Sequence, residues 1–253
     1  MAKRDLVKIK SYSSGHETKI RQKIAELFRN CPIPEDQILS NLGLFLNSKN
    51  LSRILFMDHI FKQAVDIPGV VFEFGTRWGQ NIALFSALRG IYDPFNRHRK
   101  IVGFDTFTGF PQVSLEDGNS EMMLKENLTL TKGYYEYLIK IMEYHEQESP
   151  LSHIKKYELI KGDANLEIVK YFKEHPETIV ALAFFDFDIY KPTKKCLQTI
   201  KPHLVKGSIL AFDELNDPDS PGETLALGEV FGLNNIRLKR HRFTSRTSYF
   251  VVE

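Results

Sequence analysis

The chain has 253 residues, which is long for one small domain and short for two. It carries 34 lysines and arginines against 32 acids, a net charge of +2, and 42% of its residues are hydrophobic. This balance excludes a globally basic nucleic-acid binder, and it also excludes a disordered or fibrous chain. Cys31 and Cys196 are too few for a disulfide framework or a four-cysteine zinc site, so we expect free thiols in a reducing compartment.

The beginning of the chain is basic but is not followed by the apolar run of a signal peptide. No stretch approaches the roughly 18 apolar residues of a membrane-spanning helix. We therefore expect a cytoplasmic protein that has neither a membrane nor a nucleic acid as its partner.

The first third of the chain predicts helices. Residues 1–16 are polar and are expected to form an arm, and apolar residues then recur at helical spacing over residues 17–30, 35–45 and about 51–65. Pro68-Gly69 ends this region. We assign residues 1–66 to an N-terminal arm and helical extension packed on the remainder. Its apolar faces exceed what one domain edge needs, which favours a homo-oligomer.

From Val70 onwards, short β-rich runs alternate with helical segments. The alternation predicts an α/β domain over residues 67–253, with a lid-like insertion at about 106–155. Because the apolar runs lack polar alternation, we expect a mostly parallel sheet covered on both faces. The predicted strands are 70–74, 101–104, 157–160, 179–185 and 208–212, with two more in the tail around residues 244–245. The predicted helices are 81–88, 134–144, 166–172, 193–200 and 223–230.

Residues at the ends of the first three predicted strands indicate a binding site for an adenosine-containing ligand. Ligands of open parallel sheets bind beyond the carboxyl ends of the strands. Gly75 and Gly79 flank a tight turn after the first strand, where backbone N–H groups can face a ligand. Asp105 ends the second strand and can accept hydrogen bonds from ribose hydroxyls. Asp163 follows the third strand and can accept from an adenine amino group. NAD and S-adenosylmethionine both satisfy this pattern.

The second half adds acids at two further strand ends. Asp186 and Asp188 follow the fourth strand, and Asp213 and Glu214 follow the fifth. Adjacent strand ends would bring Asp186, Asp213 and Glu214 within a few ångströms of each other, where uncompensated carboxylates repel. A divalent cation with hard oxygen ligands, such as Mg²⁺, removes that penalty. The alternative is that some of these acids cap the following helices.

These segments resemble the class I S-adenosylmethionine-dependent O-methyltransferases of the macrocin O-methyltransferase type. The resemblance rests on residues 72–75, 102–111, 185–193 and 206–215, and it covers about residues 66–230. It implies a Rossmann-like sheet with an antiparallel C-terminal strand. It also implies S-adenosylmethionine and Mg²⁺ as cofactors.

The resemblance also implies roles for individual residues. The expected cofactor-binding residues are Glu73, Gly75, Thr76, Asn81, Asp105, Thr106, Gly162, Asp163, Ala164 and Asp186. The expected metal ligands are Asp186, Asp213 and Glu214. Many relatives have Asp-Asp where this chain has Asp213-Glu214, so Glu214 departs from the pattern by one methylene.

The reaction we expect is methyl transfer to a hydroxyl of a sugar or glycosylated metabolite. A sugar hydroxyl is a poor acid, so a general base is needed. The candidates are Asp186, Asp188 and His145, with His153 and Lys191 behind them; we favour Asp186. The alternatives are a catechol-like acceptor, a nicotinamide-dependent dehydrogenase, and a non-catalytic cofactor-binding protein.

Two further segments leave their role open. The insertion at 106–155 carries Tyr134, Tyr135, Tyr137 and Tyr144, which either stack on a sugar ring or pack a helix on the core. The tail at 237–242 is locally basic, which fits a strand with one solvated face or a site for a nucleotide-sugar phosphate.

Overall fold

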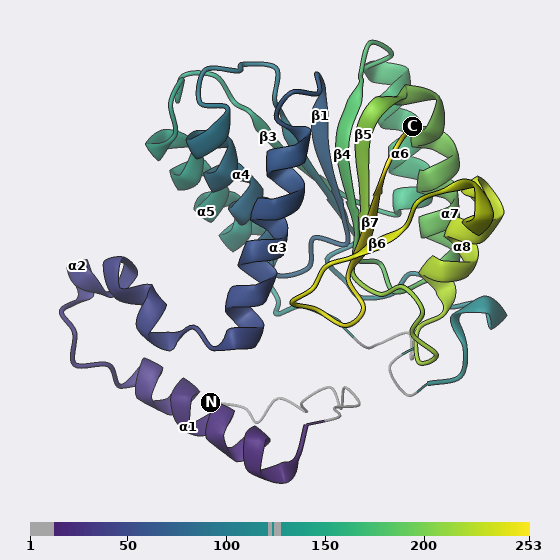
Figure 1. The fold of residues 1–253 in the computed structure, drawn as a ribbon. Helices are drawn as coiled ribbons and strands as arrows, with labels where there is room; N and C mark the ends of the chain where they lie inside the picture. The colour runs from purple at the N-terminus through teal and green to yellow at the C-terminus, as the bar shows by residue number, and fades with distance from the viewer. Residues whose placement is uncertain (1–12, 121–122, 124–127) are drawn as a thin grey trace.

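A seven-stranded sheet with helices on both faces forms the body of the protein (Figure 1). The structure is a computed structural model, and it describes residues 13–120, 123 and 128–253. The strand order is β3-β2-β1-β4-β5-β7-β6. The five strands from β1 to β5 pair in parallel, whereas β7 runs antiparallel to β5, which confirms the predicted sheet. The strands are β1 (Val70–Phe74), β2 (Ile101–Asp105), β3 (Tyr157–Lys161), β4 (Val180–Phe185), β5 (Leu204–Phe212), β6 (Lys239–Arg240) and β7 (Ser248–Val251).

In the part of the chain that the structure describes, three helices cover each face of the sheet. One face packs on α3 (Ser48–Ala64), α4 (Gln80–Tyr92) and α5 (Tyr134–Glu148). The other packs on α6 (Ala164–Glu174), α7 (Tyr190–Ile200) and α8 (Gly222–Phe231). Short 3-10 turns occur at η2 (Leu115–Asp117), η4 (Lys201–His203) and η5 (Leu233–Asn235). None of the helices in the described part of the chain is long and apolar enough to cross a membrane.

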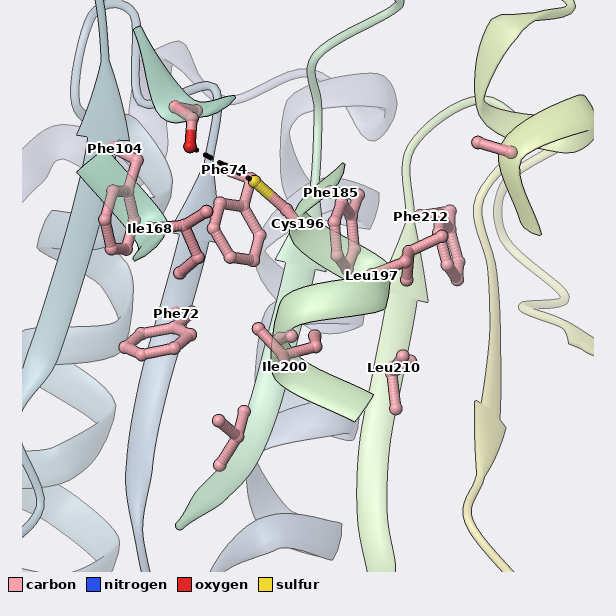
Figure 2. Close-up of a cluster of buried hydrophobic side chains, with 14 of the residues drawn as sticks. Phe72, Phe74, Phe104, Ile168, Phe185, Cys196, Leu197, Ile200, Leu210 and Phe212 are labelled. Atoms are coloured by element: carbon pink, nitrogen blue, oxygen red, sulfur yellow. Dashed lines mark hydrogen bonds between the residues drawn. The ribbon is translucent and has the colours of Figure 1, made fainter. Parts of the chain in front are cut away.

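Four phenylalanines form a row across the carboxyl ends of the parallel strands. Phe74 lies in register with Phe104 on one side and with Phe185 on the other, and Phe185 is in register with Phe212. Neighbouring rings stack with centroids 5.1, 4.7 and 5.0 Å apart (Figure 2). All four side chains are fully buried on the face covered by α6, α7 and α8. The row therefore aligns the carboxyl ends of these four strands at one edge of the sheet.

The residue that follows each phenylalanine of the row faces the opposite side of the sheet, because side chains alternate along a strand. These four residues are Gly75, Asp105, Asp186 and Asp213. Two positions behind them, Phe184 and Ala211 belong to the core under α3 and α4. The polar edge of the sheet therefore opens toward α3.

The helices of the N-terminal extension are packed on the domain less fully than the sequence predicts. Within α1 (Gly15–Arg29), α2 (Glu35–Ile38) and η1 (Leu39–Phe45) no residue is buried, so these elements do not pack on the sheet as predicted. Figure 1 shows them as an arm that lies beside the body. Among the described elements of the extension, α3 alone packs on the sheet, and its buried residues are Phe56, Met57, Ile60, Phe61 and Ala64. The first twelve residues of the expected arm lie outside the described residues.

The stretch at 106–155 divides into two parts. Helix α5 buries Leu138 and Met142 in the core beside α4, so it belongs to the helical layer. The hydroxyl of Tyr134 donates to the carbonyl oxygen of Trp78 at 2.8 Å, and that of Tyr135 donates to Leu159 at 3.2 Å. These two tyrosines therefore pack the helix, and the cavity-facing part of the insertion lies before α5.

Candidate active site

A cavity of about 910 Å³ opens at the carboxyl ends of β1, β2, β4 and β5. Ligand sites of this kind usually measure about 300–1,000 Å³, so this cavity is large enough for a cofactor and part of a second ligand. Most of the residues expected from the sequence line it: Gly75, Thr76, Asn81, Asp105, Thr106, Gly162, Asp163, Ala164, Asp186, Asp188, Asp213 and Glu214. The order of the strand ends divides the lining into a cofactor side at β1–β3 and an acidic side at β4–β5.

Buried acceptors without donors mark the inner end of the cofactor side. Glu73 is fully buried, and neither of its carboxylate oxygens has a hydrogen-bond partner within the described part of the chain. The Oγ1 of Thr76 and the Oδ1 of Asn81 also lack one. Burial raises the pKa of Glu73 well above its usual value, and Asp186 raises it further. A positively charged ligand group that carries N–H donors would satisfy these atoms.

The turn from β1 into α4 brings backbone close to the neighbouring strand end. Gly75 has a φ of +93°, and a Cβ at this position would lie 2.0 Å from the carbonyl oxygen of Asp186. Only glycine fits such an approach. The turn therefore lets a ligand lie against the backbone between β1 and β4, where the strand order reverses.

Asp105 ties together the two loops that flank its strand end. Its Oδ2 accepts from the backbone N–H of Arg77 at 2.8 Å, and its Oδ1 accepts from that of Phe107 at 2.5 Å. Burial raises its pKa, and these two amide bonds oppose the rise. Because a carboxylate has about four lone-pair sites, Asp105 keeps acceptor capacity for a ribose.

Asp163 combines a structural bond with a place in the cavity. Its Oδ1 caps α6 by accepting from the backbone N–H of Asn165 at 2.9 Å. Asp163 also lines the cavity. Asp188, Asp213 and Glu214 do not act as caps, because Ile189 and Pro221 occupy the N-cap positions of α7 and α8. The capping alternative for these later acids is therefore wrong.

An arginine that the sequence did not bring forward bridges the acids of β4 and β5. The Nη2 of Arg53, on α3, lies 2.8 Å from the Oδ2 of Asp186, and its Nη1 donates to the Oδ1 of Asp213. The guanidinium also lies over the ring of Phe184, 5.5 Å from the centroid. Burial and then Asp213 raise the pKa of Asp186 to about 7, although Arg53 opposes the rise.

The remaining acids of this side have partners of their own. Glu214 accepts from Ser220, and its Oε1 lies 2.7 Å from the Nη2 of Arg246. Asp188 is buried beside Glu214, and burial followed by this neighbour raises its pKa well above the usual value. Glu223 is fully buried; one oxygen accepts from the backbone N–H of Phe187 at 3.0 Å. Roles for Arg53, Arg246 and Glu223 are not predicted by the sequence, because each comes from a segment without a recognisable motif.

The expected magnesium ligands do not form a metal centre in this arrangement. Oxygen ligands suit Mg²⁺ chemically, but Arg53 holds Asp186 and Asp213, while Arg246 holds Glu214. No three His, Cys, Asp or Glu side chains are grouped to hold a metal ion in the described ranges. The residues as placed therefore do not fit the ion.

The histidine candidate lies elsewhere. His145 is half-buried in the last turn of α5 and is not among the residues that line the cavity. His153 and Lys191 are exposed and do not line it either. The structure thus brings Asp186 and Asp188 to the site but not the other three candidates.

Comparison with known proteins decides the family. No family model matches the chain, and no curated protein matches its sequence. Among solved structures, the calicheamicin methyltransferase CalS11 is 38% identical, with 99% of this chain and 98% of that chain covered and a TM-score of 0.93. The chain belongs to the S-adenosylmethionine-dependent O-methyltransferases.

Further structures agree with this assignment. The apo structure of CalS11, described as a TDP-rhamnose 3'-O-methyltransferase, is also 38% identical, covers 95% of this chain and 96% of that chain, and has a TM-score of 0.84. The O-methyltransferase NovP is 17% identical over 79% of each chain with a TM-score of 0.57, which supports the fold alone. The dehydrogenase and the non-catalytic alternatives are thereby overturned.

The cofactor side of the methyltransferase fits S-adenosylmethionine. The orphaned acceptors around Glu73 match an ammonium group, and Asp105 matches ribose hydroxyls. Thr106, Asp163 and Ala164 line the cavity where the adenine is expected.

Proposed function

We propose that the methyltransferase moves the methyl group of S-adenosylmethionine to a hydroxyl of a sugar carried on a small molecule. The observation that supports this most is the division of one cavity into an adenosine-binding side and a separate acidic side. Glu73 and Asp186, which interact electrostatically, lie where the two sides meet. The reactive end of the cofactor and the acceptor hydroxyl would meet at that point.

The chain's own residues would carry out orientation and proton transfer. When bound, S-adenosylmethionine supplies an electrophilic methyl on a sulfonium. Asp186 would take the proton of the acceptor hydroxyl as that oxygen is methylated, and S-adenosylhomocysteine would be the leaving group. A carboxyl with a pKa raised to about 7 is a better base than an ordinary aspartate, and it is still partly ionised at neutral pH. Fixed alignment of the reacting atoms can contribute several kcal/mol.

A nucleotide-linked sugar is the acceptor class that we favour. CalS11 is described as acting on TDP-rhamnose, and the two chains match over nearly their full lengths. Lys49 and Arg77 line the cavity and offer cations to a diphosphate. In contrast, the basic tail segment at 237–242 does not line the cavity, whereas Ser245 and Arg246 of the tail do.

The test is a methyl-transfer assay with S-adenosylmethionine and three acceptors: a nucleotide-linked deoxysugar, the free sugar and a catechol. We expect S-adenosylhomocysteine and a singly methylated sugar from the first acceptor, and at least about a 100-fold loss of kcat in Asp186→Asn. Turnover of the catechol alone, or normal turnover by Asp186→Asn with the correct sugar, would overturn the proposal.

The magnesium requirement that the sequence resemblance implies is a separate question from the proposed methyl transfer, because Arg53 and Arg246 hold the expected ligands in this arrangement. The sequence resemblance favours it, and the carboxylates of the acidic side are the residues concerned. Assays with and without EDTA test it. Full activity after complete removal of divalent cations would contradict the requirement and leave the sugar acceptor standing.

A further inference from the structure

Arg53 reaches the site from an element outside the parallel sheet. It lies on α3, one turn before the buried Phe56, and is 160 residues away from Asp213 in the chain. Its two terminal nitrogens engage one carboxylate each, so the guanidinium occupies the space between the ends of β4 and β5. This is the position at which an ion shared by Asp186 and Asp213 would have to sit.

The charge of Arg53 cannot be removed by proton loss. An arginine in a protein stays protonated; burial lowers the pKa of Arg53, but Asp186 and Asp213 more than offset this, so that its pKa is raised. The contact is also shielded: the side chains of Arg53, Asp186 and Asp213 are 25%, 20% and 15% exposed. In such surroundings charges interact more strongly than in water, so a divalent cation and the guanidinium would repel each other.

We infer that Arg53 and a divalent cation exclude each other at Asp186 and Asp213, so that Arg53 is the resident counter-ion of this acid pair and a gate to metal binding. A cation enters only when the Arg53 side chain leaves both carboxylates. Since Arg53 belongs to α3, the N-terminal extension thereby controls whether the acidic side holds a guanidinium or an ion. This inference does not require the proposed acceptor to be correct.

The position of Lys49 provides a matched control. It lies one turn earlier on α3 and lines the same cavity, but no hydrogen bond or ion pair joins it to Asp186 or Asp213 among the described contacts. Lys49→Met and Arg53→Met each remove one positive charge from the same side of the cavity. Only Arg53→Met removes the group that occupies the space between the two carboxylates.

The experiment measures Mn²⁺ binding by titration calorimetry, without cofactor or acceptor. We expect Arg53→Met to bind one Mn²⁺ at least about tenfold more tightly than the wild type, while Lys49→Met changes the affinity less than about threefold. Adding Asp213→Asn to Arg53→Met should abolish the gain. Because neither cofactor nor acceptor is present, the Mn²⁺ titration tests the inference even if the proposed methyl transfer is wrong.

Three outcomes would overturn the inference: equal Mn²⁺ affinity in wild type and Arg53→Met, weaker binding in Arg53→Met, or an equal gain in Lys49→Met. If Arg53→Met does not fold, Arg53→Gln and Arg53→Lys are measured instead. Arg53→Gln should bind Mn²⁺ more tightly than the wild type, and Arg53→Lys, which keeps the charge, should gain less than Arg53→Gln. The reverse order would also contradict the gate.

Discussion

Ionisation of Glu73 should make both the stability of the protein and its affinity for the cofactor depend on pH. Its carboxyl is fully buried, its pKa is raised by burial and by Asp186, and its oxygens lack donors in the described structure. A glutamate in the unfolded chain has a pKa of about 4.3. Because the pKa of Glu73 is raised on folding, the folded state binds more protons than the unfolded state above that pH. Stability therefore falls as the pH rises from the unfolded pKa toward the raised folded pKa.

The cofactor-free protein should accordingly lose stability as the pH rises above the pKa of the unfolded side chain, about 4.3, and Glu73→Gln should reduce this loss. Thermal melting as a function of pH measures both. S-adenosylmethionine should also bind the wild type more tightly as the pH rises, because its ammonium favours ionised Glu73. A Glu73→Gln profile parallel to the wild-type profile would contradict the role of this residue.

Asp105 should carry much of the affinity for the adenosyl group. Hydrogen bonds to charged groups contribute about 1.5–3 kcal/mol, so Asp105→Asn should weaken S-adenosylhomocysteine binding by about 10–150-fold in calorimetry. Glu158→Gln is the matched control, since Glu158 pairs with Lys100 and does not line the cavity. An Asp105→Asn protein that melts normally and binds with unchanged affinity would place the ribose elsewhere.

At the residue scale, the sequence predicted the acids well and their counter-ions poorly. Asp105, Asp186 and Asp213 follow apolar runs, and the topology of a parallel sheet brings such strand ends to one edge. Arg53 and Arg246 come from α3 and from the loop before β7, where one basic residue among many carries no signal. His145 lies on a predicted helix, but periodicity does not show which neighbour that helix packs against.

At the scale of elements, the turn after β1 shows how closely the backbone is packed at the site. A Cβ on Gly75 would meet the carbonyl oxygen of Asp186 at 2.0 Å in a region of φ that other residues avoid. Gly75→Ala should therefore lower the free energy of unfolding by roughly 2–5 kcal/mol and weaken cofactor binding.

Gly43→Ala provides the contrast within the same chain. Nothing lies within 4 Å of a Cβ at Gly43, so this change should be neutral or stabilise by less than about 1 kcal/mol. Urea denaturation of both variants makes the comparison. Equal stabilities would contradict the close approach of β1 and β4 described here.

The strands and most helices of the body follow the predicted ranges because their apolar spacing is regular. The prediction failed where spacing alone cannot specify a partner. The amphipathic segments at 17–30 and 35–45 do form helical elements, but they bury no residue in this chain. Period and polarity indicate a helix, whereas the surface that covers its apolar face depends on the rest of the fold or on another subunit.

At the scale of the whole molecule, the near-neutral charge of +2 conceals a divided distribution. Acids gather at the carboxyl ends of β4 and β5, with two arginines as their partners, while exposed cations lie at β6. The net charge excluded a globally basic nucleic-acid binder, whereas the positions of the charged residues identify the cavity. The charge of the binding site therefore has to be inferred from the residues at the strand ends rather than from the net charge of the chain.

The N-terminal arm should join two copies of the methyltransferase. Leu27, Leu39 and Leu44 are 67%, 81% and 70% exposed, and apolar patches of this kind usually mark an interface. We expect the wild type to sediment as a dimer or larger oligomer. The triple variant Leu27→Asp/Leu39→Asp/Leu44→Asp should be monomeric, with a monomer stability changed by less than about 1 kcal/mol. A monomeric wild type in analytical ultracentrifugation would contradict this.

A crystal structure of the protein with S-adenosylhomocysteine tests the central claim most directly. The account predicts the amino group of the ligand against Glu73, Thr76 and Asn81, its ribose on Asp105, and its sulfur directed toward Asp186. An adenosyl group bound away from Asp105, or a sulfur directed away from Asp186, would contradict the division of the cavity on which the proposed methyl transfer rests.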